Sequence, residues 1–295
     1  MKKELKIGFV DTCMQEFFTH TLSTRYDLII DQKNPEFLIF DCADFGSKNL
    51  TYSKKNCIKI FHTGENRRAE NYDCHYAITS DYTSALWQYR LPNCAMVPFY
   101  YSIGNTENSK TFPINHILNT HEIDTKKSKF CAFLHRNPSN ALRNTVFQEL
   151  NKYKKVDSAG PLFNNMGFTI GQEYDDKLSF IEEYKFVFAF ENSSYPGYTT
   201  EKIMDAFYVN SVPIYWGSST IDLDFNEKSF INANNFKTIK ELIDYIIWLD
   251  NNIEEYNKIR FEPKFKHKII PTCMRYDYFL NWFDSIVYNK KFMRE

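Results

Sequence analysis

The sequence predicts an α/β protein built from two Rossmann-like domains that face a cleft. The first reason is that short apolar runs alternate with helical stretches and polar loops, as in βαβ units, whose crossovers place sequential strands parallel. The second is that two such series occur, separated by a polar stretch over residues 104–129. The third is the length of 295 residues, about twice that of an ordinary domain.

The first series contains six short apolar runs that we interpret as strands. Several are apolar throughout, which is typical of strands covered on both faces of a parallel sheet, and the helices between them are weakly marked. The predicted strands span residues 5–11, 26–31, 37–43, 57–62, 76–79 and 95–99. We expect the first domain to cover residues 1–115.

The second series follows a linker. Residues 104–129 carry a proline, several asparagines and a lysine cluster, a composition that favours a linker. The second domain is expected over residues 128–270. Its predicted strands are 129–135, 156–160, 185–192 and 212–217, and its predicted helices are 138–152, 177–184, a stretch beginning near Thr199, and 238–251.

The last segment, residues 271–295, is predicted to contain an amphipathic helix. Phe279, Trp282, Phe283 and Ile286 recur at helical spacing, and two lysines follow them. We favour a C-terminal helix that packs across both domains. The alternative is a basic amphipathic helix that lies on a membrane surface, which would make a peripheral contact at the inner face of the membrane.

Composition narrows the class of protein and its partners. Hydrophobic residues make up 43% and charged residues 25%, as in ordinary soluble domains. The formal net charge of -1 gives no general attraction for nucleic acid, so local charges must bind any anionic ligand. The cysteines are scattered singly without zinc-ligand spacing, and no signal peptide or membrane span is visible. These features predict a cytoplasmic protein, although a secreted chain that had lost its leader would look similar.

The segment over residues 185–217 carries the strongest chemical signal. A buried strand, a polar loop, a helix and a second buried strand follow one another, and ligands bind beyond the carboxyl ends of such strands. Thr199 or Thr200 is expected to cap the helix, whose first N–H groups favour anions. Lys202 in the first turn is unfavourable unless a negative ligand offsets it, which suggests a phosphate. Glu201 would repel a phosphate and should face a hydroxyl, such as that of a ribose. The alternative is an ordinary strand–loop–helix with a solvated Glu–Lys pair, because no glycine-rich phosphate motif is present.

This segment resembles the donor-binding motif of the bacterial-type α-1,3-fucosyltransferases, glycosyltransferase family 10. The shared features are FENS (190–193), Tyr198, TEK (200–202) and VPIYWG (212–217), in order and at close spacing. Three further stretches are similar to family motifs, namely FHTGEN (61–66), residues 130–150 and residues 224–236.

The resemblance implies a GT-B architecture, with the acceptor sugar in the N-terminal domain and GDP-fucose in the C-terminal domain. It implies inverting transfer of L-fucose from GDP-β-L-fucose to a hydroxyl of a β-galactosyl-containing oligosaccharide or glycolipid. The expected hydroxyl is O3 of N-acetylglucosamine. No metal or other cofactor is expected to be required.

The resemblance makes Glu65, in FHTGEN, the general base that takes the acceptor's proton. Without the resemblance, Glu65 would be interpreted as a solvated loop glutamate beside Arg67 and Arg68. A cationic neighbour would lower its pKa and keep it ionised. His62, next to this motif, is a further candidate for binding the acceptor, although a histidine at a strand end is more often structural.

On the donor side, the resemblance implies that two cations hold the diphosphate and replace a metal. The donor-binding residues are expected to be Lys202 and Arg143 at the diphosphate, Glu201 at the ribose, and Asn192 and Tyr198 lining the pocket. Arg143 could equally be a surface helix arginine, and Glu191 a structural residue at the strand end. The Asp222-Leu223-Asp224 triplet has the Asp-x-Asp form of metal-dependent transferases, but we interpret it as surface.

Two other functions stay open. One is a GT-B transferase that uses another nucleotide sugar, with similar phosphate and ribose contacts and a different base or sugar pocket. The other is a non-catalytic glycan-binding protein that retains the fold.

Overall fold

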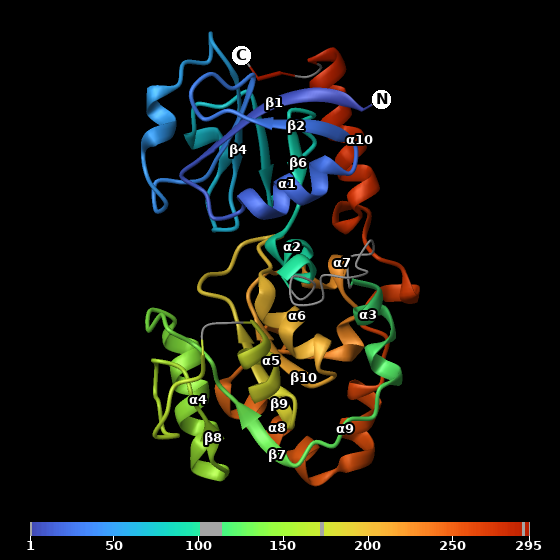
Figure 1. The fold of residues 1–295 in the computed structure, drawn as a ribbon. Coiled ribbons are helices and arrows are strands. Elements are labelled where there is room, and N and C mark those ends of the chain that lie inside the picture. The colour runs from blue at the N-terminus through green and yellow to red at the C-terminus, as the bar shows by residue number, and fades with distance from the viewer. Residues whose placement is uncertain (1, 101–113, 172–173, 291–292, 295) are drawn as a thin grey trace. The chain divides into compact units, whose positions relative to one another are not determined.

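The computed structural model describes residues 2–100, 114–171, 174–290 and 293–294. The chain forms two compact units, one of Met1–Met96 with Pro271–Glu295 and the other of Val97–Ile270 (Figure 1). Each unit has its own parallel sheet, which confirms the predicted α/β architecture of the GT-B type. No helix within the described ranges combines the length and apolar character that a membrane-spanning segment requires.

The first unit contains a six-stranded sheet in the order β2-β1-β3-β4-β5-β6, and all of its neighbouring strands are parallel. Its strands are β1 (Lys3–Val10), β2 (Tyr26–Ile30), β3 (Phe37–Phe40), β4 (Ile58–His62), β5 (Tyr76–Thr79) and β6 (Gln88–Arg90). Its helices include α1 (Gln15–Ser23), with 3₁₀ turns at Lys48–Thr51, Ala69–Asn71 and Thr272–Met274. The predicted strands from 5–11 to 76–79 are confirmed in place and type.

The predicted strand over 95–99 is wrong, because these residues belong to the helix α2 (Asn93–Tyr100). A short apolar run fits a buried helix as well as a buried strand, and Pro92, just before the helix, can start a helical turn. The sheet edge is taken instead by β6, whose short polar run Gln88–Arg90 gave no strand signal.

The C-terminal helix α10 (Tyr276–Asn289) belongs to the first unit. Its aromatic side chains pack on that unit, with ring centroids of Phe279 and Phe18 6.3 Å apart and those of Phe283 and Tyr26 6.0 Å apart. Asp284 adds an ion pair with Arg25 at 2.6 Å. Since the apolar face of α10 is buried in this unit, the membrane-surface alternative loses the apolar side chains on which it depends.

The second unit contains a five-stranded parallel sheet in the order β11-β10-β9-β7-β8. Its strands are β7 (Lys129–Ala132), β8 (Val156–Asp157), β9 (Tyr184–Phe190), β10 (Val212–Trp216) and β11 (Ile231–Asn232). Its helices are α3 (Ile114–Asn119), α4 (Ala141–Tyr153), α5 (Tyr174–Ile181), α6 (Glu201–Tyr208), α7 (Ile221–Asp224), α8 (Ile239–Asn251) and α9 (Ile253–Arg260). Short 3₁₀ turns lie at Thr120–Glu122, Glu227–Ser229, Ala233–Asn235 and Lys266–Lys268.

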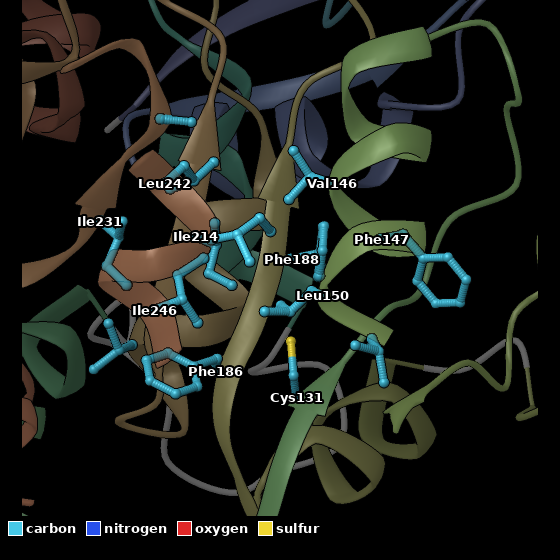
Figure 2. Packing of buried hydrophobic residues seen from close by; sticks show 14 of the residues in the cluster. Cys131, Val146, Phe147, Leu150, Phe186, Phe188, Ile214, Ile231, Leu242 and Ile246 are labelled. Atoms are coloured by element: carbon cyan, nitrogen blue, oxygen red, sulfur yellow. The ribbon is translucent and has the colours of Figure 1, made fainter. Parts of the chain in front are cut away.

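Both faces of the central strand β9 are covered. Phe186 and Phe188 of β9 join one core layer with side chains of α4, α8 and β10, as Figure 2 shows. Val187, which points to the other face, packs with residues of α5 and α6. This two-sided burial is the reason that β9 is apolar throughout Phe186–Phe190.

The predicted linker over residues 104–129 falls partly within the described residues. Residues 101–113 lie outside the described part of the chain. Residues 114–122 form α3 and a 3₁₀ turn, so the linker prediction is wrong there. His116 of α3 contacts the carbonyl of Tyr208 at the end of α6, at 3.0 Å, which ties α3 to the second unit. The division between units therefore falls at Met96, earlier than the predicted end of the first domain.

The second unit also contains a buried lysine and a half-buried one that have no part in the predicted site. The Nζ of Lys264 has no exposed surface and donates to the carbonyl of Arg260 at 2.6 Å. The Nζ of Lys127 donates to the carbonyl of Val209 at 2.6 Å. Burial, and then the nearby Arg260, lowers the pKa of each ammonium to about 7.

We expect Lys264→Met to remove part of the pH dependence of stability. The pKa of Lys264 is about 7 when folded and 10.5 ordinarily, so in this window the unfolded chain binds the extra proton. Wild-type stability therefore falls as the pH drops through this window, by at most about 1.4 kcal/mol per pH unit. In urea unfolding, the free energy of unfolding of the wild type, relative to that of the variant, should be larger at pH 9.5 than at pH 7.5. The exposed Lys240→Met is the control, and an unchanged difference between wild type and Lys264→Met would refute the expectation.

Candidate active site

The carboxyl ends of the second sheet gather the residues of the motif over 185–217. β9 ends at Phe190, β10 ends at Trp216, and α6 begins at Glu201. Glu191, the first residue after β9, donates its backbone N–H to the Trp216 carbonyl at 2.7 Å. Because parallel strands end at one edge of their sheet, the loop after β9 and the start of α6 share the edge where ligands bind.

Glu191 is a structural residue, which was one of the two roles left open by the sequence. Its side chain is fully buried, and its carboxylate accepts from the backbone N–H and from the hydroxyl of Thr200, each at 2.7 Å. Thr200 stands at the N-cap position of α6, but its hydroxyl makes no capping bond. The predicted cap position is therefore confirmed at Thr200, but without a side-chain capping bond, and the buried carboxylate of Glu191 fastens the start of the helix to the sheet.

Lys202 lies between two carboxylates. Its Nζ is 3.3 Å from Oε2 of Glu191, 3.0 Å from Oε1 of Glu201 and 2.8 Å from Oγ1 of Thr200. Burial favours the neutral amine, but Glu191 and Glu201 outweigh it and raise the pKa of Lys202 above its usual value. The ammonium is thus fixed in its charged form. The chain itself supplies the negative charge that the sequence argument had assigned to a ligand.

Glu201 presents an ionised carboxylate to a cavity of about 490 Å³. Burial works to raise its pKa, but Lys202 and then Lys177 lower it to about 2. The cavity is also lined by residues 134–136, 160–161 and 169–171, all within the second unit. Its volume falls in the range of about 300–1,000 Å³ that small-molecule sites occupy, and the carboxylate on its wall is an acceptor for hydroxyl groups.

Arg143 is fully buried, in contrast to the surface arginine that one reading of the sequence allowed. Asn140 caps α4 by accepting the Arg143 backbone N–H at 2.9 Å. The guanidinium Nη1 lies 3.1 Å from Nδ1 of His135 and donates to Oδ1 of Asn192 at 3.3 Å, while Nη2 donates to the Asn137 carbonyl. Arg143 therefore holds the loop after β7 against the loop after β9. Its Nε makes no hydrogen bond within the described residues, so this N–H is left for a diphosphate that reaches the buried guanidinium.

Asn192 and Tyr198, the other two predicted donor residues, frame the loop between β9 and α6. Asn192 is exposed, whereas Tyr198 is 3% exposed and donates its backbone N–H to the Tyr195 carbonyl at 3.0 Å. Tyr195 is 39% exposed, so it offers a ring face at this edge of the sheet. Asn192, Glu201 and Lys202 thus lie on two connected segments that Arg143 and Glu191 hold in place.

In the first unit, Glu65 lies in an exposed loop after β4, at the carboxyl end of that sheet. Its backbone N–H donates to Oγ1 of Thr63 at 3.1 Å. The neighbouring arginines pair with other carboxylates, Arg67 with Asp44 at 2.8 Å and Arg68 with Asp81. The two arginines therefore fasten the loop that carries Glu65 to the loops on either side. The sequence had assigned them instead to keeping Glu65 ionised.

His62 is not placed to contact an acceptor. The side chain has no exposed surface, its Nδ1 lies 3.6 Å from Oδ2 of Asp41, and its ring meets the Phe18 ring edge-on at 5.0 Å. The prediction that His62 binds the acceptor is therefore wrong for this structure. As the last residue of β4, His62 points into the core, and the chain reaches the sheet edge only after it.

The Asp-x-Asp triplet lies on the one-turn helix α7. Asp222 is half-exposed and 4.0 Å from the ammonium of Lys266, while Asp224 is buried. The surface interpretation therefore fits Asp222 and is wrong for Asp224, although the two side chains, two residues apart on a helix, point in different directions. Within the described ranges, no group of three or more His, Cys, Asp or Glu side chains is placed to hold a metal ion.

The sequence analysis missed a lysine at the cavity and the buried acid that pairs with it. Lys177 of α5 lines the cavity and forms an ion pair with Asp205 of α6, whose side chain is buried. Asp205 lies four positions after Glu201, the spacing that places two side chains on one face of a helix. That spacing was visible in EKIMD (201–205) and could have identified a second acid beside the pocket.

Comparison with known protein families gives matches over most of the chain. The model of the "Glycosyltransferase family 10 (fucosyltransferase) C-term" family matches residues 123–280. The model of the "Alpha-(1,3)-fucosyltransferase FucT N-terminal domain" matches residues 7–97. The alpha-(1,3)-fucosyltransferase FucT of Helicobacter pylori is 32% identical over 271 residues, which cover 82% of this chain and 54% of the relative. Alpha-(1,3)-fucosyltransferase B of Drosophila melanogaster is 35% identical over 127 residues, which cover 40% of this chain and 29% of the relative. The chain thus spans about half the length of the bacterial relative and less of the insect one.

Solved structures give the same result for the fold. A crystal structure of an alpha1,3-fucosyltransferase superposes with a TM-score of 0.81 at 26% identity, covering 99% of this chain and 92% of the other. A crystal structure of an alpha1,3-fucosyltransferase with GDP gives a TM-score of 0.79 at 26% identity with the same coverage. These neighbours share the two-sheet architecture and one of them binds the nucleotide.

Proposed function

Because the chain belongs to glycosyltransferase family 10, the fucosyltransferases, we propose that it transfers L-fucose from GDP-β-L-fucose to a hydroxyl of an oligosaccharide or glycolipid. The observation that carries this proposal is the carboxylate of Glu201. It is ionised, it lies on the wall of a cavity of nucleotide size, and it stands next to a charged lysine in the family's own motif. A nucleoside diphosphate sugar presents hydroxyl groups, which a carboxylate accepts, and phosphates, which a cation binds. The neighbouring Glu201 and Lys202 offer one charge for each.

The donor is proposed to bind in the second unit. Glu201 accepts the ribose hydroxyls, and Lys202 faces the diphosphate with Asn192 and Tyr198 beside it. Lys202 is supported by its permanent charge, because an ammonium between two carboxylates stays protonated when a diphosphate approaches. Arg143 contributes a second cation if the diphosphate reaches the Nε–H of its buried guanidinium.

The transfer is proposed to invert the anomeric carbon in one displacement. Glu65 takes the proton of the acceptor hydroxyl as its oxygen forms a bond to C1 of fucose. The bond from C1 to the β-phosphate oxygen breaks in the same step, and GDP leaves with that electron pair. Lys202, with Arg143, stabilises the charge that develops on the diphosphate, so no metal is required.

The acceptor is proposed to be a β-galactosyl-containing glycan, fucosylated at O3 of N-acetylglucosamine. The support is the α-1,3 linkage that gives the similar proteins their names.

Calorimetric titration with several nucleotide sugars tests the donor, and GDP release with a lactosamine acceptor tests the reaction. We expect GDP-fucose to bind more tightly than GDP-mannose and any UDP-sugar, and GDP release to depend on acceptor in buffer containing EDTA. Tighter binding of another nucleotide sugar would favour the alternative donor. Binding without any release of GDP would favour a glycan-binding protein. Loss of release in EDTA with recovery in manganese would overturn the metal-free mechanism.

A further inference from the structure

The cavity beside Glu201 is lined by a fixed cation, Lys177 of α5. Lys177 lines the cavity together with Glu201 and forms an ion pair with Asp205. The Asp205 side chain is 1% exposed, so Lys177 is paired with a buried carboxylate. Lys177 itself keeps 25% of its side chain exposed, on the cavity side of that ion pair.

The acid that pairs with Lys177 lies on the same helix face as Glu201. Glu201 and Asp205 are four residues apart on α6, and α5 packs against α6 through the core that Leu178 and Ala206 share. The Lys177 ammonium is therefore fixed by Asp205 and lines the same cavity as Glu201. Glu201 itself pairs with Lys202, whose Nζ is 3.0 Å from Oε1 of Glu201.

This arrangement fixes the state of the Glu201 carboxylate. Lys202 and then Lys177 act to keep it ionised against the effect of burial. An ionised carboxylate has about four acceptor positions, of which Lys202 takes one. The remaining positions can accept hydroxyl groups of a ligand in the cavity, and a vicinal diol supplies two such hydroxyls in the right spacing.

We propose that Lys177 is a positioning residue for the nucleotide ribose, acting through Glu201. Fixed by Asp205, Lys177 places a positive charge on the same cavity wall as the Glu201 carboxylate and favours the orientation in which that carboxylate accepts both the 2′ and the 3′ hydroxyl. The inference rests on the proposed function, which puts a guanosine diphosphate in this cavity. It adds a residue pair, Lys177 and Asp205, that determines how tightly the ribose is held.

The experiment compares two ligands that differ only in the ribose hydroxyls. Calorimetry measures the Kd of GDP and of 2′,3′-dideoxy-GDP for the wild type and for Lys177→Met. We expect Lys177→Met to weaken GDP binding about tenfold, roughly the value of one hydrogen bond to a charged group. Binding of dideoxy-GDP should change by less than about twofold, because the hydroxyls through which Lys177 acts are missing.

Two further variants separate positioning from folding. Lys177→Arg keeps the ion pair with Asp205 and should restore most of the GDP affinity. Lys185→Met removes another part-buried lysine of this unit, one paired with Asp250 at 2.8 Å and outside the cavity lining, and should leave both affinities unchanged. In turnover assays, Lys177→Met should raise the KM for the donor with little change in kcat.

The outcomes distinguish this inference from the function on which it rests. Failure of the wild type to bind GDP would refute the nucleotide site itself. Wild-type binding of GDP with an equal loss for both ligands in Lys177→Met would overturn the inference, since Lys177 would then contact the base or phosphates directly or serve only the fold. If Lys177→Met does not fold, the same comparison with Asp205→Asn decides the question.

Discussion

Replacement of Glu65 by glutamine is expected to lower kcat by a factor of about 10²–10⁴, the usual contribution of a general base. Glutamine keeps the size and the hydrogen-bonding shape of the side chain but cannot accept the acceptor's proton. The loop that carries Glu65 should keep its conformation, because Arg67 and Arg68 fasten it to Asp44 and Asp81 without using the Glu65 carboxylate in either ion pair. The loss should therefore appear in the chemical step.

The measurement is GDP release under saturating donor and acceptor, together with the Kd of GDP by calorimetry. GDP affinity should stay within about twofold of wild type, because Glu201 and Lys202, the proposed nucleotide contacts, lie in the other unit. Glu70→Gln is the matched control, since Glu70 is an exposed glutamate five positions further along the same segment. Turnover close to the wild-type rate in Glu65→Gln would remove Glu65 from the role of base.

Most of the fold was predictable because its strands are buried on both faces. In β9 the run Phe186–Phe190 is apolar, since Phe186 and Phe188 face α4 and α8 while Val187 faces α5 and α6. The same reasoning failed at 95–99, where a buried helix has an equally apolar sequence. It failed again at β6, because a short strand with polar residues carries no such pattern.

The sequence predicted only those site residues whose surroundings depend on their place next to a strand or helix end. Glu201 and Lys202 were predicted from their place at the start of α6, and the Glu201 side chain lines the cavity in the second unit. The burial of Arg143 depends on how the loop over 135–140 folds back over it, which helical spacing does not encode. The contact between Lys177 and Asp205 depends on the packing of α5 on α6, a tertiary event with no local signal.

Lys202→Met is expected to reduce kcat/KM by a factor of about 10²–10³, the cost of removing one preorganised group that stabilises developing charge. The same change has a structural consequence, because Lys202 is the counter-ion of the fully buried Glu191. Burial already raises the pKa of Glu191 and Lys202 opposes that rise, so the variant should raise it further. A carboxyl whose pKa is raised on folding gives stability that is lost as the pH rises through its folded pKa. Lys202→Met should therefore have a lower Tm at pH 8 than at pH 6, relative to wild type.

The double variant Lys202→Met with Glu191→Gln separates these two effects. Glutamine at position 191 can still accept from Thr200 through its amide oxygen but carries no charge to be left unpaired. We expect the double variant to recover much of the Tm and to lose the pH dependence added by Lys202→Met, while kcat/KM stays as low as in the single variant. Recovery of turnover together with stability would show that Lys202 only holds the helix start in place. Recovery of stability without recovery of turnover would support the Lys202 ammonium as the group that contacts the diphosphate. In that case the fold would be intact and only the positive charge would be missing.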